Sequence, residues 1–297
     1  MSDATVPEVR LAGRRETDAG RFVREGGRNR FTARRAAVQR VERVAPTLVR
    51  VTVTGPEFAD FTSAGPADHV KVFFPDPETG ELVAPTPVGP GEDGIVRPDR
   101  GSISRDFTPL PRITDAGVEL DLDFFVHPDP GPASSWAQSA RPGDELVIVG
   151  PRGSRRAPQE IDGIVLICDE TSLPSVSRWV REIPSGTRAD IIAAIPASGE
   201  WVAGYLGNVP GVDIRVHIVA PDAAGESVLT AVERLAPIGE GVYVWAAGEA
   251  AALVPVRRYL RRTLGLSAAQ AQLSGYWRRG TVAFDHHAPI DPFDPDE

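Results

Sequence analysis

Two hydrophobic patterns divide the chain near residue 156. From about residue 31 to 155, apolar and polar residues alternate, as in LVRVTVTG, where Val49, Val51 and Val53 share one face. GVELDLDFFV alternates in the same way, and a period of two is typical of half-buried antiparallel strands. Together with HVKVFFP, SRDFTP and ELVIVGP, these segments predict a six-stranded antiparallel Greek-key barrel.

After residue 160 the strands become nearly continuous apolar runs. GIVLICDE, VDIRVHIVA and GVYVWAAG are each followed by a segment with helical character, such as TSLPSVSRWVREI or GESVLTAVERL, and ADIIAAIP is another such run. Parallel strands read in this way because helices cover both faces of their sheet. The second half is therefore predicted to be a doubly wound α/β domain with a parallel sheet. Its ligands should lie at the carboxyl ends of the strands, near residues 168–172, 246–250 and the loop after residue 195.

These patterns predict four parts of the chain. Residues 1–28 form an arginine-rich extension that we expect to be disordered, and residues 285–297 form an acidic, solvated tail. Between them, residues 29–156 form the barrel domain and residues 157–284 form the α/β domain.

Composition and charge narrow the function. The net charge of −9 argues against a general nucleic-acid-binding protein, and no apolar run approaches the roughly 20 residues that span a bilayer. The amino terminus lacks the apolar core of a secretion signal, so a cytoplasmic location is expected. The single cysteine, Cys168, excludes an intrachain disulfide and cysteine-ligated zinc or iron–sulfur sites, and neither H-E-x-x-H nor G-x-S-x-G occurs. The single lysine, Lys71, does not follow glycine, which excludes a P-loop.

The stretch SRDFTP carries the first candidate site. In a strand, alternation places Arg105, Phe107 and Pro109 on one face and Asp106 and Thr108 on the other. A guanidinium can hold a phosphate while a nearby ring covers an aromatic ligand. The alternative is a core phenylalanine beside an arginine whose charged end reaches solvent.

A second candidate lies in HPDPGPASSW. A short helix is predicted after Gly131, and the small residues 133–135 in its first turn leave backbone N–H groups open to an anion. Combined with Arg105 one strand earlier, this pattern favours a diphosphate site. The alternative is a connecting helix that Trp136 anchors in the core.

Three further stretches follow predicted strands of the second half. In CDETSLPS, Asp169 and Glu170 close a strand and Thr171 opens a helix, an arrangement that suits either capping or ligand contact. In VYVWAAGEA, Gly248 permits close approach of a ligand and Glu249 begins the next helix. SGYWRRG combines two aromatic rings with two arginines, which would suit an anionic aromatic partner or an edge strand packed on the sheet.

The ordered set RDFT, GPASSWAQSARPGDELVIVGPRG, DETSLPS, VWAAGEAAALVPVRRYLRR and GYWRRG resembles the siderophore-interacting protein family. Members of that family are flavin-dependent ferric-siderophore reductases of the ferredoxin-reductase superfamily, and the resemblance runs from about residue 31 to 284. It implies an FAD-binding barrel followed by an NAD(P)H-binding α/β domain, with NADPH or NADH as electron donor. It also implies that a hydride passes to flavin N5 and that single electrons then reduce ferric siderophore, releasing Fe(II).

The resemblance further implies roles for individual residues. Thr108 would approach flavin N5 and is the catalytic candidate. The residues implied to bind the cofactors are Arg105, Asp106, Phe107, Thr108, His127, Gly131, Ala133, Ser134, Ser135, Trp136, Asp169, Glu170, Thr171, Gly248 and Glu249. Lys71, Arg278 and Arg279 would bind the anionic chelate. No residue is expected to ligate a metal of the protein's own.

Two other interpretations remain open. Phe107 stands where the family usually has tyrosine, and Cys168 stands where it usually has glycine. Pro109 and Leu110 fill the place where the family usually has an arginine close behind the threonine, and the next arginine here is Arg112. These departures would suit a relative repurposed for a biosynthetic transformation, with a degenerate dinucleotide site. The GYWRRG segment would also suit a non-redox module that captures an anionic chelate. In each case we expect a monomer whose partner is a small molecule, without nucleic acid or membrane.

Overall fold

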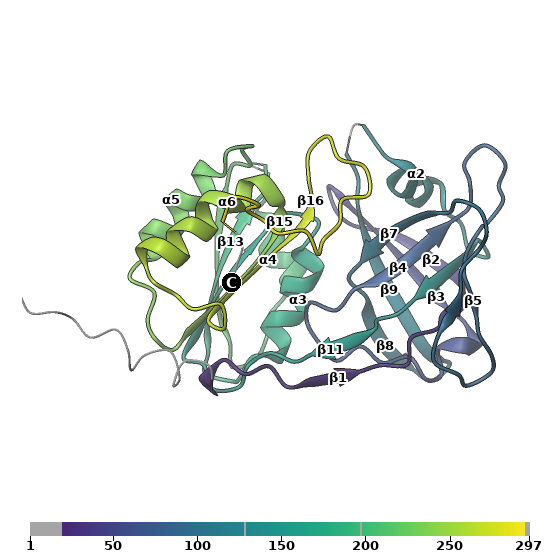
Figure 1. Ribbon diagram of the computed structural model, residues 1–297, viewed down its shortest axis with the longest axis horizontal. Coiled ribbons are helices and arrows are strands. Elements are labelled where there is room, and N and C mark those ends of the chain that lie inside the picture. Colours follow the sequence, from purple (N-terminus) through teal and green to yellow (C-terminus); the bar gives the residue numbers. More distant parts are fainter. Residues whose placement is uncertain (1–19, 128, 197, 295–297) are drawn as a thin grey trace, which may run out of the picture.

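A curled antiparallel sheet forms the first domain of the computed structural model, which describes residues 20–127, 129–196 and 198–294 (Figure 1). In pairing order its strands are β7 (Ile103–Phe107), β4 (Val70–Phe74), β10 (Glu145–Val149), β2 (Ala33–Ala45), β3 (Leu48–Thr54), β9 (Gly117–Phe125) and β8 (Leu110–Thr114). β7 and β8 lie at opposite ends of this order, yet two residues, Thr108 and Pro109, join them. The sheet therefore closes on itself, which confirms the predicted barrel.

The barrel has seven strands where six were predicted. SRDFTP was expected to form one strand, but β7 pairs with β4 and ends at Phe107, whereas β8 begins at Leu110 and pairs with β9. Proline has no N–H to donate to a neighbouring strand, so the ladder breaks at Pro109. This break places Thr108 and Pro109 at the junction between the domains.

The inside of the barrel is filled by alternate residues of its strands. Val51, Leu122 and Leu146 are fully buried there. Helix α2 (Pro132–Ser139) packs over one end, against β9, β4 and β7. The short helix η1 (Pro56–Phe58) and the ribbon of β5 (Thr86–Pro87) and β6 (Ile95–Val96) lie in the long connections of this domain.

The second domain has a five-stranded parallel sheet. Its strands, in pairing order, are β14 (Asp213–Val219), β13 (Arg188–Ala194), β12 (Gly163–Cys168), β15 (Val242–Glu249) and β16 (Ala271–Trp277). The chain turns from β12 to β13 on one side and returns to β15 on the other, so the topological switch point lies between β12 and β15. In sheets of this kind ligands bind outside the carboxyl ends of the strands at that point.

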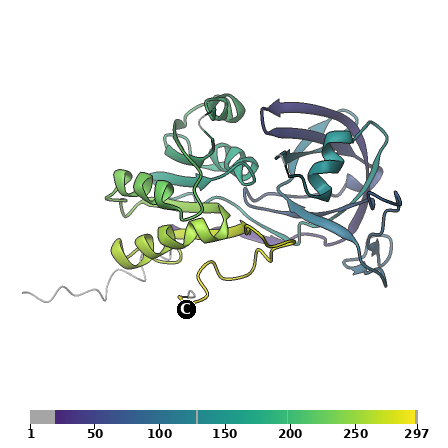
Figure 2. The same cartoon turned by 90° about the horizontal axis from the view of Figure 1, so that it is seen from above.

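Helices cover both faces of this sheet (Figure 2). Helices α3 (Leu173–Glu182) and α4 (Trp201–Leu206) lie on one face, while α5 (Glu226–Leu235), α6 (Ala250–Arg258) and the π-helix η2 (Tyr259–Thr263) lie on the other. Leu166 and Trp245 pack under the first pair, and Val165 and Val244 pack under the second. Because successive side chains of a strand point to opposite faces, continuous apolar runs were needed to serve both layers. None of the helices in the described ranges is both long and apolar enough to cross a membrane.

Part of the amino-terminal extension is ordered, contrary to the prediction for residues 1–28. Residues 1–19 lie outside the described residues, but β1 (Gly26–Arg28) pairs with β11 (Gly153–Arg155) along the junction between the domains. Phe22 is buried against Tyr243, and the Arg24 guanidinium lies 4.8 Å from the centre of the Trp179 ring. These apolar and cation–π contacts hold a segment that its charge alone had suggested would be solvated.

The acidic tail is likewise packed from residue 285 to 294, and residues 295–297 lie outside the described part. Ile290 is buried in the α5/α6 layer, and Asp291 pairs with Arg258 at 2.7 Å. Asp294 pairs with Arg257 at 3.1 Å. The arginines at the end of α6 therefore hold a segment that was expected to be solvated.

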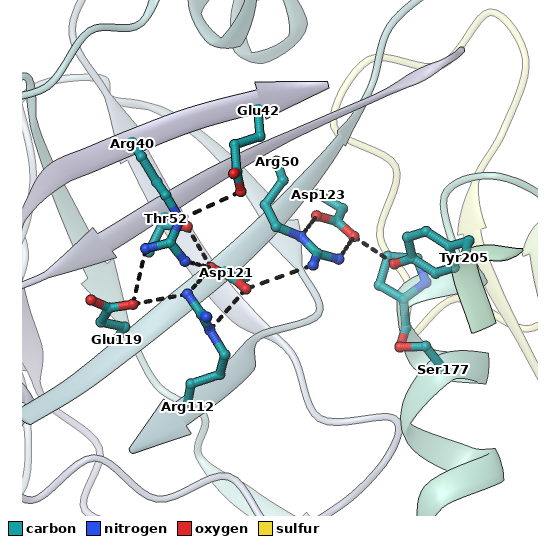
Figure 3. A network of polar contacts seen from close by, with 11 residues as sticks. Arg40, Glu42, Arg50, Thr52, Arg112, Glu119, Asp121, Asp123, Ser177 and Tyr205 are labelled. Atoms are coloured by element: carbon teal, nitrogen blue, oxygen red, sulfur yellow. Dashed lines mark hydrogen bonds and ion pairs between the residues drawn. The ribbon is translucent and has the colours of Figure 1, made fainter. Parts of the chain in front are cut away.

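A polar network joins the outer face of the barrel to the α/β domain (Figure 3). The Asp123 carboxylate of β9 accepts two hydrogen bonds from Arg50, each of 2.7 Å, and a third from the Tyr205 hydroxyl of α4. Next to it, Asp121 lies within 3.6 Å of Arg40 and 3.1 Å of Arg112. Buried carboxylates are tolerated when they are paired and hydrogen-bonded, so this network fixes one orientation of the domains.

Candidate functional site

The two domains meet at the break between β7 and β8. The Thr108 hydroxyl is buried and lies 2.8 Å from the Ser175 hydroxyl in the first turns of α3. Ser175 in turn lies 3.1 Å from the Tyr276 hydroxyl near the end of β16. The catalytic candidate is thus held at the carboxyl edge of the sheet by a chain of three hydroxyl groups.

Arg178 closes the same junction from α3. One of its terminal nitrogens donates to the carbonyl oxygen of Pro109 and to the Ser63 hydroxyl, each at 2.9 Å, and the other donates to the Ser63 carbonyl at 2.7 Å. Burial lowers the pKa of this guanidinium, although nearby Asp68 and Glu182 oppose that effect. No motif in the sequence indicates this role, because Arg178 lies in an ordinary amphipathic helix.

Asp169 links the ends of β12, β15 and β16. One of its oxygens accepts from the backbone and hydroxyl of Thr171, at 2.9 and 2.6 Å. The other accepts from the Glu249 backbone at 3.1 Å and from the Trp277 indole at 2.7 Å. Because protein donors engage both oxygens, Asp169 is part of the framework at the switch point. Trp277 was missed as its partner, since no local spacing relates β16 to β12.

Gly248 and Glu249 contribute to the same group of contacts at the ends of β15 and β16. Gly248 has φ of 152°, and a Cβ there would lie 2.7 Å from an Asp169 oxygen. The Asp169 side chain therefore occupies the space beside Gly248 that was expected to receive a ligand. The Glu249 carboxylate accepts from the Ala252 backbone at 2.7 Å, which caps α6, and from the Arg279 backbone at 3.1 Å.

Glu170 is the second acid at this edge of the sheet, and its surroundings differ from those of Asp169. Its side chain is 7 % exposed, and apart from its own backbone N–H no described residue is recorded as donating to its carboxylate. Burial, with a contribution from the Asp169 charge, raises the pKa of Glu170 to about 7. A buried acid with a perturbed pKa at a switch point is typical of a functional site.

The predicted diphosphate site also has free donors. The Arg105 guanidinium is recorded donating to the carbonyl oxygen of Ser104, and it forms no ion pair within the described ranges. Helix α2 begins after Gly131 without a side-chain cap, which leaves the first-turn amides of Ala133 and Ser134 open. The residues present therefore fit a diphosphate group, which needs positive charge and backbone donors together.

Several other candidates of this region serve the barrel itself. The Ser134 hydroxyl donates to the Phe125 carbonyl at 2.8 Å. The Trp136 ring packs 5.3 Å from that of Phe74, as expected for a core anchor. Phe107 is partly buried, and its ring lies 4.4 Å from that of Phe124.

The remaining candidates lie nearer the surface. Ser135 is exposed, and the His127 ring lies 5.5 Å from the Phe125 ring on the connection between β9 and α2. Arg278 and Arg279 are exposed at the end of β16. The roles assigned to all these residues stay predictions.

Lys71 and Asp106 face each other across β4 and β7. The Lys71 ammonium lies 2.7 Å from the Asp106 carboxylate, and His286 lies 3.3 Å from the same carboxylate. These partners hold the pKa of Asp106 at about 2, although burial opposes them. The carboxyl-terminal segment thus reaches the barrel, which the interpretation of residues 285–297 as a solvated tail had missed. Among the described residues, no group of three or more His, Cys, Asp or Glu side chains is placed to hold a metal ion.

Comparisons with known families cover both domains. Residues 37–155 match the family described as the siderophore-interacting FAD-binding domain. Residues 161–280 match the family described as siderophore-interacting protein.

Characterised relatives and solved structures agree with these matches. The chain is 36% identical to an NADPH-dependent ferric-chelate reductase of Escherichia coli over 190 residues, which covers 63% of this chain and 72% of the relative. It is 26% identical to the ferric vibriobactin reductase ViuB of Vibrio cholerae over 247 residues, which covers 82% of this chain and 89% of the relative. A siderophore utilization protein from T. fusca superposes with a TM-score of 0.77 at 36% identity, covering 89% of this chain and 100% of that one. A flavohemoglobin from Malassezia yamatoensis, at 13% identity and a TM-score of 0.57, shares the fold over 84% of this chain and 61% of that one.

Proposed function

Because the chain belongs to the siderophore-interacting protein family, we propose that it is an FAD-dependent NAD(P)H oxidoreductase that reduces ferric siderophores. The observation that carries this proposal is the junction where β7, with its unpaired Arg105, meets the switch point of the parallel sheet. The names of the Escherichia coli and Vibrio cholerae relatives support the ferric chelate as substrate.

The barrel residues would bind the flavin nucleotide. Arg105 and the open amides at the start of α2 would hold its diphosphate, since both present positive charge and neither has an acidic partner in the described part of the chain. Bound FAD would supply a carrier that accepts two electrons from a nicotinamide and delivers them singly to iron.

The junction residues would orient the reacting groups and exclude water. Thr108 is 6 % exposed, and Ser175 fixes its hydroxyl, so it can present one defined oxygen toward a flavin edge. Tyr276 supplies the third hydroxyl, and burial raises its pKa above the ordinary value. The nicotinamide end of the donor would bind at the carboxyl edge of the sheet, near Asp169 and Glu170.

The exposed basic residues would bind the substrate. Lys71, Arg278 and Arg279 are exposed and carry positive charge, which suits an anionic ferric chelate. Reduction to Fe(II) weakens binding by hard oxygen ligands, so the metal would leave its chelator without a protein ligand set.

The experiment that tests this proposal is an anaerobic titration of FAD-loaded protein. Excess NADPH or NADH should bleach the flavin absorbance, and ferric tris-catecholate or tris-hydroxamate should restore it with formation of Fe(II), trapped by a ferrous-specific dye. A protein that takes up no FAD, or whose reduced flavin is not reoxidised by either chelate, contradicts the proposal. Chelate binding without any electron transfer would indicate a non-redox binding module.

A matched pair of variants locates the flavin site. Arg105→Ala removes the unpaired guanidinium, and we expect the FAD affinity to fall about tenfold or more, because a charged contact to the diphosphate is lost. Arg35→Ala removes a side chain that is 74% exposed on the outer face of β2, and FAD affinity should stay unchanged. Equal FAD affinity for both variants would contradict the assignment of Arg105.

A further inference from the structure

Three histidines from two distant parts of the chain meet beside Lys71. His69 directly precedes β4, and the rings of His286 and His287 come from the carboxyl-terminal segment. The His286 ring lies 4.4 Å from that of His69 and 4.0 Å from that of His287. His69 and His287 are exposed, so a ligand in solution can reach this cluster.

The segment that delivers the two histidines is anchored on both sides of them. Before them, the Phe284 ring packs on Gly275 of β16, where a Cβ would lie 3.1 Å from the ring. After them, Ile290 is buried and Asp291 pairs with Arg258. In Figure 1 this yellow segment leaves β16, loops toward the barrel and returns to the α/β domain. Contacts on both sides of the two histidines therefore fix the positions of their imidazoles.

Ion pairs surround the cluster. The Lys71 ammonium is paired with Asp106 at 2.7 Å, and Asp106 also accepts from His286. On the other side Arg257 and Asp291, of opposite charge, line a cavity of about 200 Å³ with His286 and His287. Arg257 is paired with Asp294 and Asp291 with Arg258, while the Asp285 carboxylate accepts a hydrogen bond from the His287 backbone. Each imidazole that takes up a proton adds one positive charge to these surroundings.

We propose that His69, His286 and His287 form a proton-linked recognition site for anionic ferric chelates, in which binding of the chelate is coupled to protonation of the imidazoles. This inference rests on the proposed function, because it places the chelate beside Lys71. It adds to that function a group of specificity residues that distinguish anionic from uncharged chelates.

The coupling has a definite sign. An anion near the cluster favours imidazolium over imidazole, so binding takes up protons and strengthens as the pH falls toward the ordinary histidine range. Partial desolvation of the His69 ring and the neighbouring His286 lower the pKa of His69, and a bound anion opposes that shift. A chelate without net charge gains little from the same protonation.

The test measures binding of redox-inert gallium complexes to the FAD-loaded protein by calorimetry at several pH values. For the trianionic gallium tris-catecholate, we expect the dissociation constant to fall about tenfold between about pH 8 and pH 6.5. Titrations in buffers of different ionisation enthalpy should show net proton uptake. For an uncharged gallium tris-hydroxamate, the change should stay within about twofold.

Glutamine variants assign the effect to the cluster. The triple variant His69→Gln, His286→Gln, His287→Gln should lose most of the pH dependence for the tris-catecholate, whereas His217→Gln should keep it. His217 is a matched control because it lies on β14, paired with Asp190 at 3.2 Å. The flavin content of each variant reports folding, and single variants replace the triple one if its flavin content falls.

Two outcomes overturn the inference: an unchanged pH dependence in the triple variant, or an equal pH dependence for the uncharged complex. Its failure is separable from failure of the proposed function, because gallium binding needs no electron transfer. Histidine-dependent binding without iron reduction would contradict the reductase function alone. Iron reduction with pH dependence that survives the triple substitution would contradict this inference alone.

Discussion

Glu170 should make the protein less stable as the pH rises. Burial raises the pKa of its carboxyl group to about 7 in the folded chain, above a value of 4.5 in an unfolded one. Between these two values the unfolded chain has released the proton and the folded chain has kept it. The stability that this group contributes is complete below about pH 4.5 and is lost as the pH rises through about 7.

The structure also sets the size of this effect. The interval from 4.5 to about 7, at about 1.4 kcal/mol for each pKa unit, corresponds to about 3 kcal/mol. Screening by solvent reduces this free energy little, because the side chain is 7 % exposed. Glu170→Gln keeps the shape of the side chain and cannot ionise. We expect this variant to equal the parent protein in stability near pH 4.5 and to exceed it by about 3 kcal/mol near pH 8.

Denaturant unfolding of the FAD-free chain from pH 4.5 to 8.5 measures the difference directly. Glu78→Gln serves as the control, since Glu78 lies exposed on a turn and its substitution should give the same small change at every pH. A Glu170→Gln difference that does not vary with pH would refute the reasoning. So would a difference of opposite sign, with the variant less stable than the parent at high pH.

Three further predictions concern the junction. Asp169→Asn turns an amide donor toward groups that now donate to a carboxylate, so unfolding should become easier by about 3 kcal/mol, and the rate of flavin reduction by NADPH should fall. Arg178→Met removes the donors to the carbonyl oxygen of Pro109 while keeping the buried stem, and a loss of about 3 kcal/mol should appear in the denaturation midpoint. Tyr205→Phe removes one hydrogen bond to Asp123 and should cost about 1 kcal/mol, measured in the same way with an unchanged denaturant slope.

The sequence predicted the two domains because each has its own hydrophobic period. β3 and β9 alternate because a barrel strand buries one face, whereas β12 and β15 are continuous apolar runs because helices cover both faces of their sheet. The predictions for the two terminal segments were wrong for a physical reason. Charge and low hydrophobicity suggest solvation, but Phe22 and Ile290 each fill a place in a core that other segments create, and Asp291 meets an arginine only in the folded chain.

The site could be predicted only where neighbours in space are also neighbours in sequence. Arg105 and Thr108 lie on one short stretch, and the capping role of Glu249 lies within one helical turn. Contacts between segments carry no such signal. The hydrogen bond from Trp277 to Asp169 and the contact between His69 and His286 join residues more than 100 positions apart.

Asp169 and Glu170 show why residue type alone does not assign a role. Both acids follow the same buried strand, and both are nearly inaccessible to solvent. Asp169 accepts hydrogen bonds from three elements, so its carboxylate is part of the framework. Glu170 has burial without such donors, and its carboxyl group therefore keeps a proton near neutral pH. The surroundings of two neighbouring acids therefore give them different properties: Asp169 holds the strand ends together, and Glu170 retains its proton.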